Sequence, residues 1–241
     1  MKNLKKIFIV LVLVLIAAGC GIKKSDDDFK DVEDSSVAVL LNNHMINLTA
    51  IPKTIDLLKK GEFKAEDYTN DDRLYMGLYS ALNSQLAVSY SQEQIKALKA
   101  KGYVATAYIK GETVESQIND LFGAVDVKFE KEITGCPSYK YYEPDKFYLV
   151  NENCTNTQDK LAIMIESTKF DANIYKVKAY ITLVSNNKVY KDLNKTTAVK
   201  TLQTGEIFTI DASNKDDFAT YTFTFTKNTD GKFEFTSAKK D

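Results

Sequence analysis

The spacing of apolar residues changes once along the chain, close to residue 124. Before that point apolar residues recur every three or four positions, which is typical of amphipathic α-helices. After it they recur at every second position, as in Val125, Val127 and Phe129, which is typical of a strand with one exposed face. The pattern predicts an α+β fold, with a helical half (36–123) followed by a mainly antiparallel, twisted β-sheet (124–241). One domain or two abutting halves both fit this order of elements.

Five helices are expected in the first half, and several carry their own start signal. Pro52 interrupts the first helical stretch, Thr69 or Asn70 caps the third helix, and the spacing of Ser91 and Gln94 forms a capping box for the fourth. The apolar stripes are Val37, Leu40, Leu41, Met45, Leu48; Ile55, Leu57, Leu58; Leu74, Leu78, Leu82, Leu86; Ile95, Leu98; and Val114, Ile118, Leu121, Phe122.

Strands are expected wherever the alternating pattern continues between turn residues. The predicted strands are Val125–Phe129, Tyr139–Tyr142, Phe147–Val150, Leu161–Thr168, Ile174–Val184, Val189–Lys191, Ile207–Ile210, Ala219–Thr226 and Lys232–Ser237, with Tyr103–Ile109 as a less regular candidate.

The last two strands can be placed in register from their aromatic residues. A three-residue loop, Thr229 to Gly231, sets Phe225 opposite Phe235 and keeps all the phenylalanines on one face. A two-residue loop would expose two of them. We therefore predict the three-residue loop, with Gly231 in the left-handed conformation.

The N-terminal segment has a different composition from the rest of the chain. A basic start (Lys2, Lys5, Lys6) precedes the apolar run Ile7–Ala18, and small residues lead into Cys20. The run is shorter than the roughly 20 residues that span a bilayer. This order resembles a bacterial lipoprotein signal peptide with its lipobox.

The resemblance implies that residues 1–19 are removed and that Cys20 becomes the first mature residue, carrying a diacylglyceryl thioether. The protein would then be anchored by lipid to the cell membrane, on its extracytoplasmic face. Residues 20–35 are polar and are interpreted as a flexible tether. An ordinary cleaved signal followed by an incidental cysteine is the alternative.

Charge argues against one class of partner. Cleavage would remove three of the 32 basic residues and no acidic one, so that 29 basic and 33 acidic residues remain, a formal charge of −4. Arg73 is the only arginine, and lysine lacks the guanidinium fork that grips phosphate. We expect no binding to nucleic acid.

The two remaining cysteines form an even pair in an expected oxidising compartment. We interpret Cys136 and Cys154 as a disulfide. If residues 144–146 form the loop of the intervening hairpin, the two cysteines face each other across it. Free thiols or a zinc pair are the alternatives, although no CxxC and only one histidine are present.

The same hairpin concentrates tyrosine residues. In the register just given, Tyr142 faces Tyr148 on one side of the hairpin, and Tyr141 faces Leu149 on the other. Tyr139, Tyr141, Tyr142 and Tyr148 are the candidate binding surface, because exposed tyrosines suit contacts with proteins or glycans. The alternative is that both faces of the hairpin are buried.

No catalytic, metal-binding or cofactor motif is found. The chain has no GxSxG, no phosphate-binding glycine loop and no HExxH motif. His44, the only histidine, lies on or beside an apolar helical stripe and is interpreted as a packed residue. A catalytic pair of carboxylates needs only two placed acids, and no pair can be nominated.

The element order is loosely similar to NTF2-like or cystatin-like modules of bacterial lipoproteins. The leading hypothesis is a non-catalytic binding module, anchored by lipid outside the cytoplasm, whose partner is a protein or an envelope polymer. An extracytoplasmic acid-dependent hydrolase is the alternative, and a small-ligand carrier is a third possibility that the lack of two matched α/β lobes disfavours.

Overall fold

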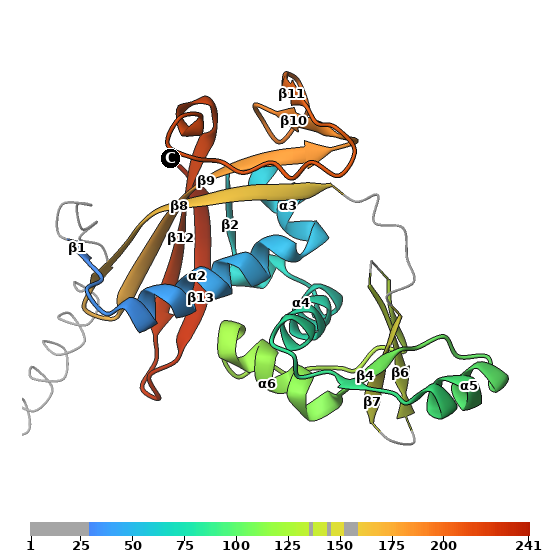
Figure 1. The fold of residues 1–241 in the computed structure, drawn as a ribbon. Helices are drawn as coiled ribbons and strands as arrows, with labels where there is room; N and C mark the ends of the chain where they lie inside the picture. Colours follow the sequence, from blue (N-terminus) through green and yellow to red (C-terminus); the bar gives the residue numbers. More distant parts are fainter. Residues whose placement is uncertain (1–28, 135–136, 144–145, 152–158) are drawn as a thin grey trace, which may run out of the picture. The chain divides into compact units, whose positions relative to one another are not determined.

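The structure, a computed structural model, describes residues 29–134, 137–143, 146–151 and 159–241 (Figure 1). Asp31–Asp241 form one compact unit. Within the described residues there are five α-helices and 13 strands, and the strands form two antiparallel sheets. The helices lie mostly in the N-terminal half, which confirms the predicted α+β class.

The helices are bounded close to where the apolar stripes placed them. They are α2 (Ser35–Ala50), α3 (Pro52–Lys59), α4 (Asn70–Asn83), α5 (Gln92–Ala100) and α6 (Gly111–Phe122). None of the helices among the described residues combines the length and apolar character that a membrane crossing requires.

Side chains at the helix starts explain these bounds. Thr69 accepts a hydrogen bond from the backbone N of Asp72, whose carboxylate accepts one from the backbone N of Thr69. Ser91 and Gln94 form the same reciprocal capping box at α5. Each box satisfies two backbone donors that a helix start leaves without intrahelical partners. The box at Ser91 and the cap at Thr69 were predicted, and the reciprocal bond from Asp72 was not. Pro52 begins α3, where its missing N–H costs nothing.

The larger sheet contains the long strands of the C-terminal half. Its neighbours run in the order β1-β8-β9-β12-β13-β2, and β10 connects β9 to β11. The strands are β2 (Glu62–Lys64), β8 (Lys160–Asp171), β9 (Ile174–Ser185), β10 (Lys188–Tyr190), β11 (Ala198–Thr201), β12 (Ala219–Lys227) and β13 (Phe233–Lys240); β1 (Lys30–Asp31) has two residues.

The register predicted for the last hairpin is confirmed. Phe225 pairs with Phe235, and the backbone N of Asn228 donates to the O of Lys232 at 2.9 Å, which leaves a three-residue loop. Gly231 has φ +83°, a left-handed conformation that glycine adopts without strain. The phenylalanines of both strands consequently share one buried face.

That aromatic face is covered by the helices. One cluster of buried side chains joins β12 and β13 to α2, α4 and α6, so it draws on both halves of the chain. A partly buried polar bridge links the same three helices. Asn47 donates to Ser80 (3.0 Å), and Ser80 donates to Gln117 (2.6 Å).

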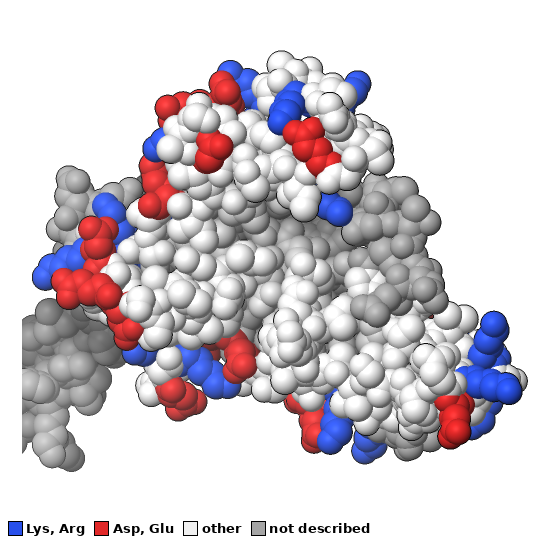
Figure 2. Space-filling model, in the orientation of Figure 1, with Lys and Arg blue, Asp and Glu red and all other residues white. Residues whose placement is uncertain are grey.

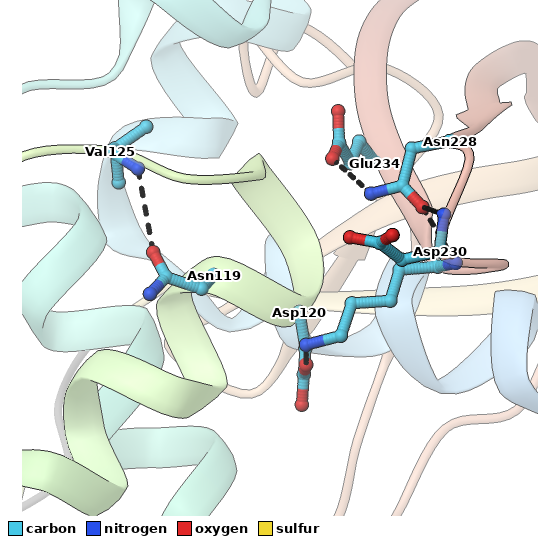
Figure 3. Close-up of polar contacts among 7 residues, drawn as sticks. Asn119, Asp120, Val125, Asn228, Asp230 and Glu234 are labelled. Atoms are coloured by element: carbon cyan, nitrogen blue, oxygen red, sulfur yellow. Dashed lines mark hydrogen bonds and ion pairs between the residues drawn. The ribbon is translucent and has the colours of Figure 1, made fainter.

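A polar contact also ties α6 to the tip of the last hairpin (Figure 3). Lys232 Nζ lies 2.6 Å from a carboxylate oxygen of Asp120. On the same hairpin, Asn228 donates to Glu234 at 2.7 Å and accepts from the backbone N of Asp230 at 3.0 Å. The contact joins residues 112 positions apart, so it helps to hold α6 on the sheet.

Three predicted strands need correction. Val125–Phe129 is not a strand and pairs with none of the described strands; the side chain of Asn70 instead makes two hydrogen bonds, of 2.8 and 3.0 Å, with the backbone of Lys128. Ile207–Ile210 is irregular, and Ile207 is 85% exposed. The strand expected at Tyr103–Ile109 is shorter, Ala107–Lys110.

Candidate functional site: the outer face of the smaller sheet

The smaller sheet contains the tyrosine-rich hairpin. Its order is β3-β4-β7-β6-β5. The strands are β3 (Val88–Ser89), β4 (Ala107–Lys110), β5 (Glu132–Ile133), β6 (Ser138–Tyr142) and β7 (Phe147–Asn151).

The predicted register of the hairpin is wrong by one residue. Tyr141 pairs with Tyr148, and Tyr142 pairs with Phe147. The connection therefore spans positions 143–146, closed by a hydrogen bond of 3.2 Å from the backbone N of Lys146 to the O of Glu143. Lys146 takes the left-handed conformation, with φ 51°.

The one-residue shift divides the four predicted tyrosines differently between the two faces. Tyr139 and Tyr148 are 1% and 0% exposed and belong to the main core, so they cannot form a binding surface. Burial raises the pKa of Tyr148, whose hydroxyl donates to the backbone O of Glu130 at 3.0 Å. Tyr141 is half-buried on the same face and stacks on Phe129.

The opposite face carries a continuous row of partly exposed aromatic rings. We call this set, Tyr90, Tyr108, Phe147, Tyr142 and Tyr103, the aromatic row. Consecutive ring centroids are 5.1, 4.7, 5.5 and 5.7 Å apart in that order. Of the four predicted tyrosines, Tyr142 alone belongs to the row. Phe147 also belongs to the hairpin, and Tyr90, Tyr103 and Tyr108 come from β4 and the loops beside it.

Backbone pairing explains how residues distant in sequence reach one face. Phe147 pairs with Lys110 on β4 and with Tyr142 on β6, and directly paired residues share a face in an antiparallel sheet. Tyr108 pairs with Val88 of β3 on the same side. The backbone N of Tyr90 donates to the O of Thr106 at 3.0 Å, which extends the row past β3.

Apolar and basic side chains border the aromatic row. Val88 is 45% exposed and Val104 is 57% exposed, which is unusual for side chains of this type. Lys140 Nζ lies 5.1 Å from the centroid of the Tyr103 ring, within the range of a cation–π contact. The face thus offers flat apolar area, tyrosine hydroxyls and a cation at one end.

The predicted cysteine sites lie outside the described residues. This applies to the lipidation site Cys20 and to both members of the disulfide, Cys136 and Cys154. The register that set the two cysteines opposite each other is not the one observed for the described part of the hairpin. The disulfide therefore stays a prediction that rests on the even number of remaining cysteines and on the expected oxidising compartment.

His44 lies among core residues, as the sequence predicted. His44 is 8% exposed on α2, and its ring centroid lies 6.2 Å from that of Phe225. Burial lowers its pKa to about 4, and the nearby carboxylate of Asp120 opposes the shift. The imidazole is therefore neutral near pH 7 and packs among core residues.

One cavity has several acidic residues in its lining, and we compare it with what an acid-dependent hydrolase would need. A cavity of about 560 Å³ is lined by residues that include Asp192, Asp216 and Asp217. The carboxylate of Asp192 accepts hydrogen bonds from the hydroxyl of Thr196 and from backbone N–H groups, which lower its pKa. A general acid needs the opposite shift. Among the described residues, no group of three potential metal ligands occurs.

Comparisons of the chain with protein-family models, with curated proteins and with solved structures found no match.

Proposed function

We propose that this chain is a lipid-anchored extracytoplasmic lipoprotein whose folded part is a non-catalytic binding module for a protein or an envelope polymer. The aromatic row is the observation that carries the binding role. Partly exposed aromatic rings supply large contact area at a small entropic cost, and tyrosine adds a hydrogen-bonding hydroxyl. The lipobox-like sequence before Cys20 supports the lipid anchor and the extracytoplasmic location.

The filled core supports a binding module over a hydrolase. Phe223, Phe225 and Phe235 of the larger sheet are buried by packed side chains, so the part of the face that they cover is filled and not open to a substrate. The aromatic row, by contrast, lies on an outer face where a partner has access.

The binding role is tested by changing two rings of the row. The Tyr108→Ser/Phe147→Ser double variant of the full chain is compared with wild type for retention on two separate fractions, purified wall polymer and detergent-solubilised envelope protein. We expect retention on one of the fractions to fall by about tenfold or more, because central aromatic contacts each contribute more than about 1 kcal/mol.

The matched control is Tyr190→Ser, which removes a partly exposed tyrosine from β10 of the other sheet. Thermal melting of each variant separates lost binding from lost folding. Equal retention of wild type and a folded double variant on both fractions would overturn the role of the aromatic row.

The anchor is tested separately with Cys20→Ser in a bacterial host that processes lipoproteins. Wild type should incorporate radiolabelled palmitate and enter the detergent phase. The variant should lose both properties while the folded part keeps its melting temperature, because Cys20 lies outside the compact unit Asp31–Asp241. Palmitate labelling that persists in the variant would contradict the anchor.

A further inference from the structure

Among the described residues, the two-residue strand β1 is the neighbour of β8 on its outer side, and it lies beside the second half of β8. On one side β8 pairs with β9 along its whole length, from Lys160 opposite Val184 to Asp171 opposite Ile174. On the other side, the backbone N of Val32 donates to the O of Thr168 at 3.0 Å. No strand of the described part of the chain runs beside Lys160–Ile165. An open edge is a template for pairing with another strand.

The sequence of this edge is apolar between two opposite charges. Lys160 and Glu166 flank Leu161, Ala162, Ile163, Met164 and Ile165, all of which are partly exposed. Natural edges usually carry charges or prolines that prevent pairing. Here the interior of the run carries none, and the register irregularity of the strand comes only at its end, between Ile165 and Ser167.

The segment Lys160–Glu166 can pair antiparallel with the same segment of a second copy so that apolar residues face apolar residues and opposite charges meet. With a two-fold axis at Ile163, Ala162 lies opposite Met164, Leu161 opposite Ile165, and Lys160 beside Glu166 of a second copy. Residues that pack on one side of the sheet then continue on that side in the other copy, as antiparallel pairing requires. Opposite charges meet at both ends of the paired segment.

Neighbouring registers lose this match. An axis at Ala162 sets Lys160 opposite Met164, and an axis at Met164 sets Ala162 opposite Glu166. A parallel arrangement sets Lys160 beside Lys160 of the second copy, which is repulsive. Only the axis at Ile163 pairs every apolar residue with an apolar residue and every charge with its opposite.

The surface beside this edge is also poor in charge. Figure 2 shows lysine, arginine and acidic side chains mainly around the margin of the view, whereas the area over α2 and β8 is largely uncharged. α2 packs against β8 and carries three exposed apolar residues, Val39 (57%), Leu40 (41%) and Ile46 (45%). These three side chains supply exposed apolar area on a helix that packs against β8.

We propose that two copies of this chain associate through antiparallel pairing of Lys160–Glu166, so that the larger sheet continues across a two-fold axis. The exposed apolar residues of α2 add area beside the paired strands. An interface that is the same patch on both copies is the commonest form of homodimer. The proposal does not depend on the binding role of the aromatic row, which lies on the other sheet.

A charge swap tests the register. The oligomeric state of the full-length chain in detergent is measured by light scattering over a range of concentrations. Lys160→Glu alone and Glu166→Lys alone should each weaken the dimer by about tenfold or more, because two pairs per dimer become repulsive. The double swap, Lys160→Glu with Glu166→Lys, should restore dimerisation. Lys169→Glu, on the same strand beyond the paired segment, is the control and should dimerise as wild type.

Folding of each variant is checked by circular dichroism, since Glu166 also forms an ion pair with Lys178 at 3.2 Å within the chain. A photo-crosslinking residue at position 163 provides a second readout that needs no charge change. It should link position 163 of one copy to the same segment of another. A chain that stays monomeric at all concentrations, a dimer that the single charge changes leave unaltered, or crosslinks from position 163 to a different protein would each overturn the proposal.

Discussion

His44 shows how one buried side chain couples folding to pH. The folded chain holds it 8% exposed, and burial lowers its pKa from the ordinary 6.5 to about 4. Between these two values the unfolded chain binds a proton that the folded chain does not. The contribution of His44 to stability is therefore complete above pH 6.5 and is lost as the pH falls towards 4.

We expect the free energy of unfolding to drop by about 2 kcal/mol between pH 7 and pH 5 because of His44. Urea denaturation at several pH values measures the drop. His44→Leu should flatten the curve over this window, since no other histidine is present. A slope that is the same in the variant would show that the imidazole is not buried as described.

At Gly77, α4 lies close to α6. A Cβ at this position would lie 2.7 Å from Cγ1 of Ile118 and 2.9 Å from the backbone O of Val114. Both distances are shorter than real Cβ contacts, and a backbone oxygen of a packed helix cannot move away without shifting the helix.

Gly77→Ala should therefore destabilise the protein by about 2 kcal/mol, although the same change inside an exposed helix normally stabilises by about 1 kcal/mol. The midpoint of thermal unfolding measures the effect. In an Ile118→Ala background, Gly77→Ala should cost less than it does in wild type but should still destabilise, because the contact with the Val114 oxygen remains. An unchanged or higher midpoint in Gly77→Ala would contradict the close approach of α4 and α6.

At the scale of elements, α4 and α5 begin with the same capping box but differ in what they bury. α4 buries seven residues in the core, whereas α5 buries none. The cap on α4 therefore stabilises the whole core. The cap on α5 stabilises a helix that can unfold locally without exposing the core.

This difference predicts different outcomes when the capping residue of each helix is replaced by alanine. Thr69→Ala should lower the free energy of unfolding by about 1 kcal/mol, and Ser91→Ala should leave it nearly unchanged. Hydrogen exchange of the α5 amides should nevertheless become faster in Ser91→Ala, because the helix end frays. Equal losses of global stability in the two variants would show that α5 is part of the cooperative core.

At the scale of the whole molecule, both halves of the chain contribute to one described core. Tyr68 of the helical half makes ring contacts with Phe122 of α6 and with Phe235 of β13. Since neither half has a separate core of comparable size, we expect one cooperative unfolding transition. Amides of α4 and of β12 should share the same free energy of opening in native-state hydrogen exchange. Two separate transitions would show that 36–123 and 124–241 fold independently.

The helices and the last hairpin could be predicted from the chain because local signals agreed there. The spacing of apolar residues, the caps at Thr69 and Ser91, and the glycine at position 231 all pointed to the same elements. In the last hairpin, one register alone buried all the phenylalanines, so the hydrophobic pattern determined it.

The tertiary structure decided what the pattern left undetermined. In the β6–β7 hairpin both faces carry aromatic residues, so burial did not distinguish the two registers and the loop was misjudged by one residue. Val125–Phe129 had the right alternation but is not a strand; the side chain of Asn70, 58 positions from Lys128 along the chain, instead forms hydrogen bonds with its backbone. The aromatic row depends on pairing between four separate segments, and no local spacing encodes which strands will lie side by side. The proposed lipid anchor and extracytoplasmic location, by contrast, rest on one contiguous segment from Lys2 to Cys20, so the sequence alone is sufficient to propose them.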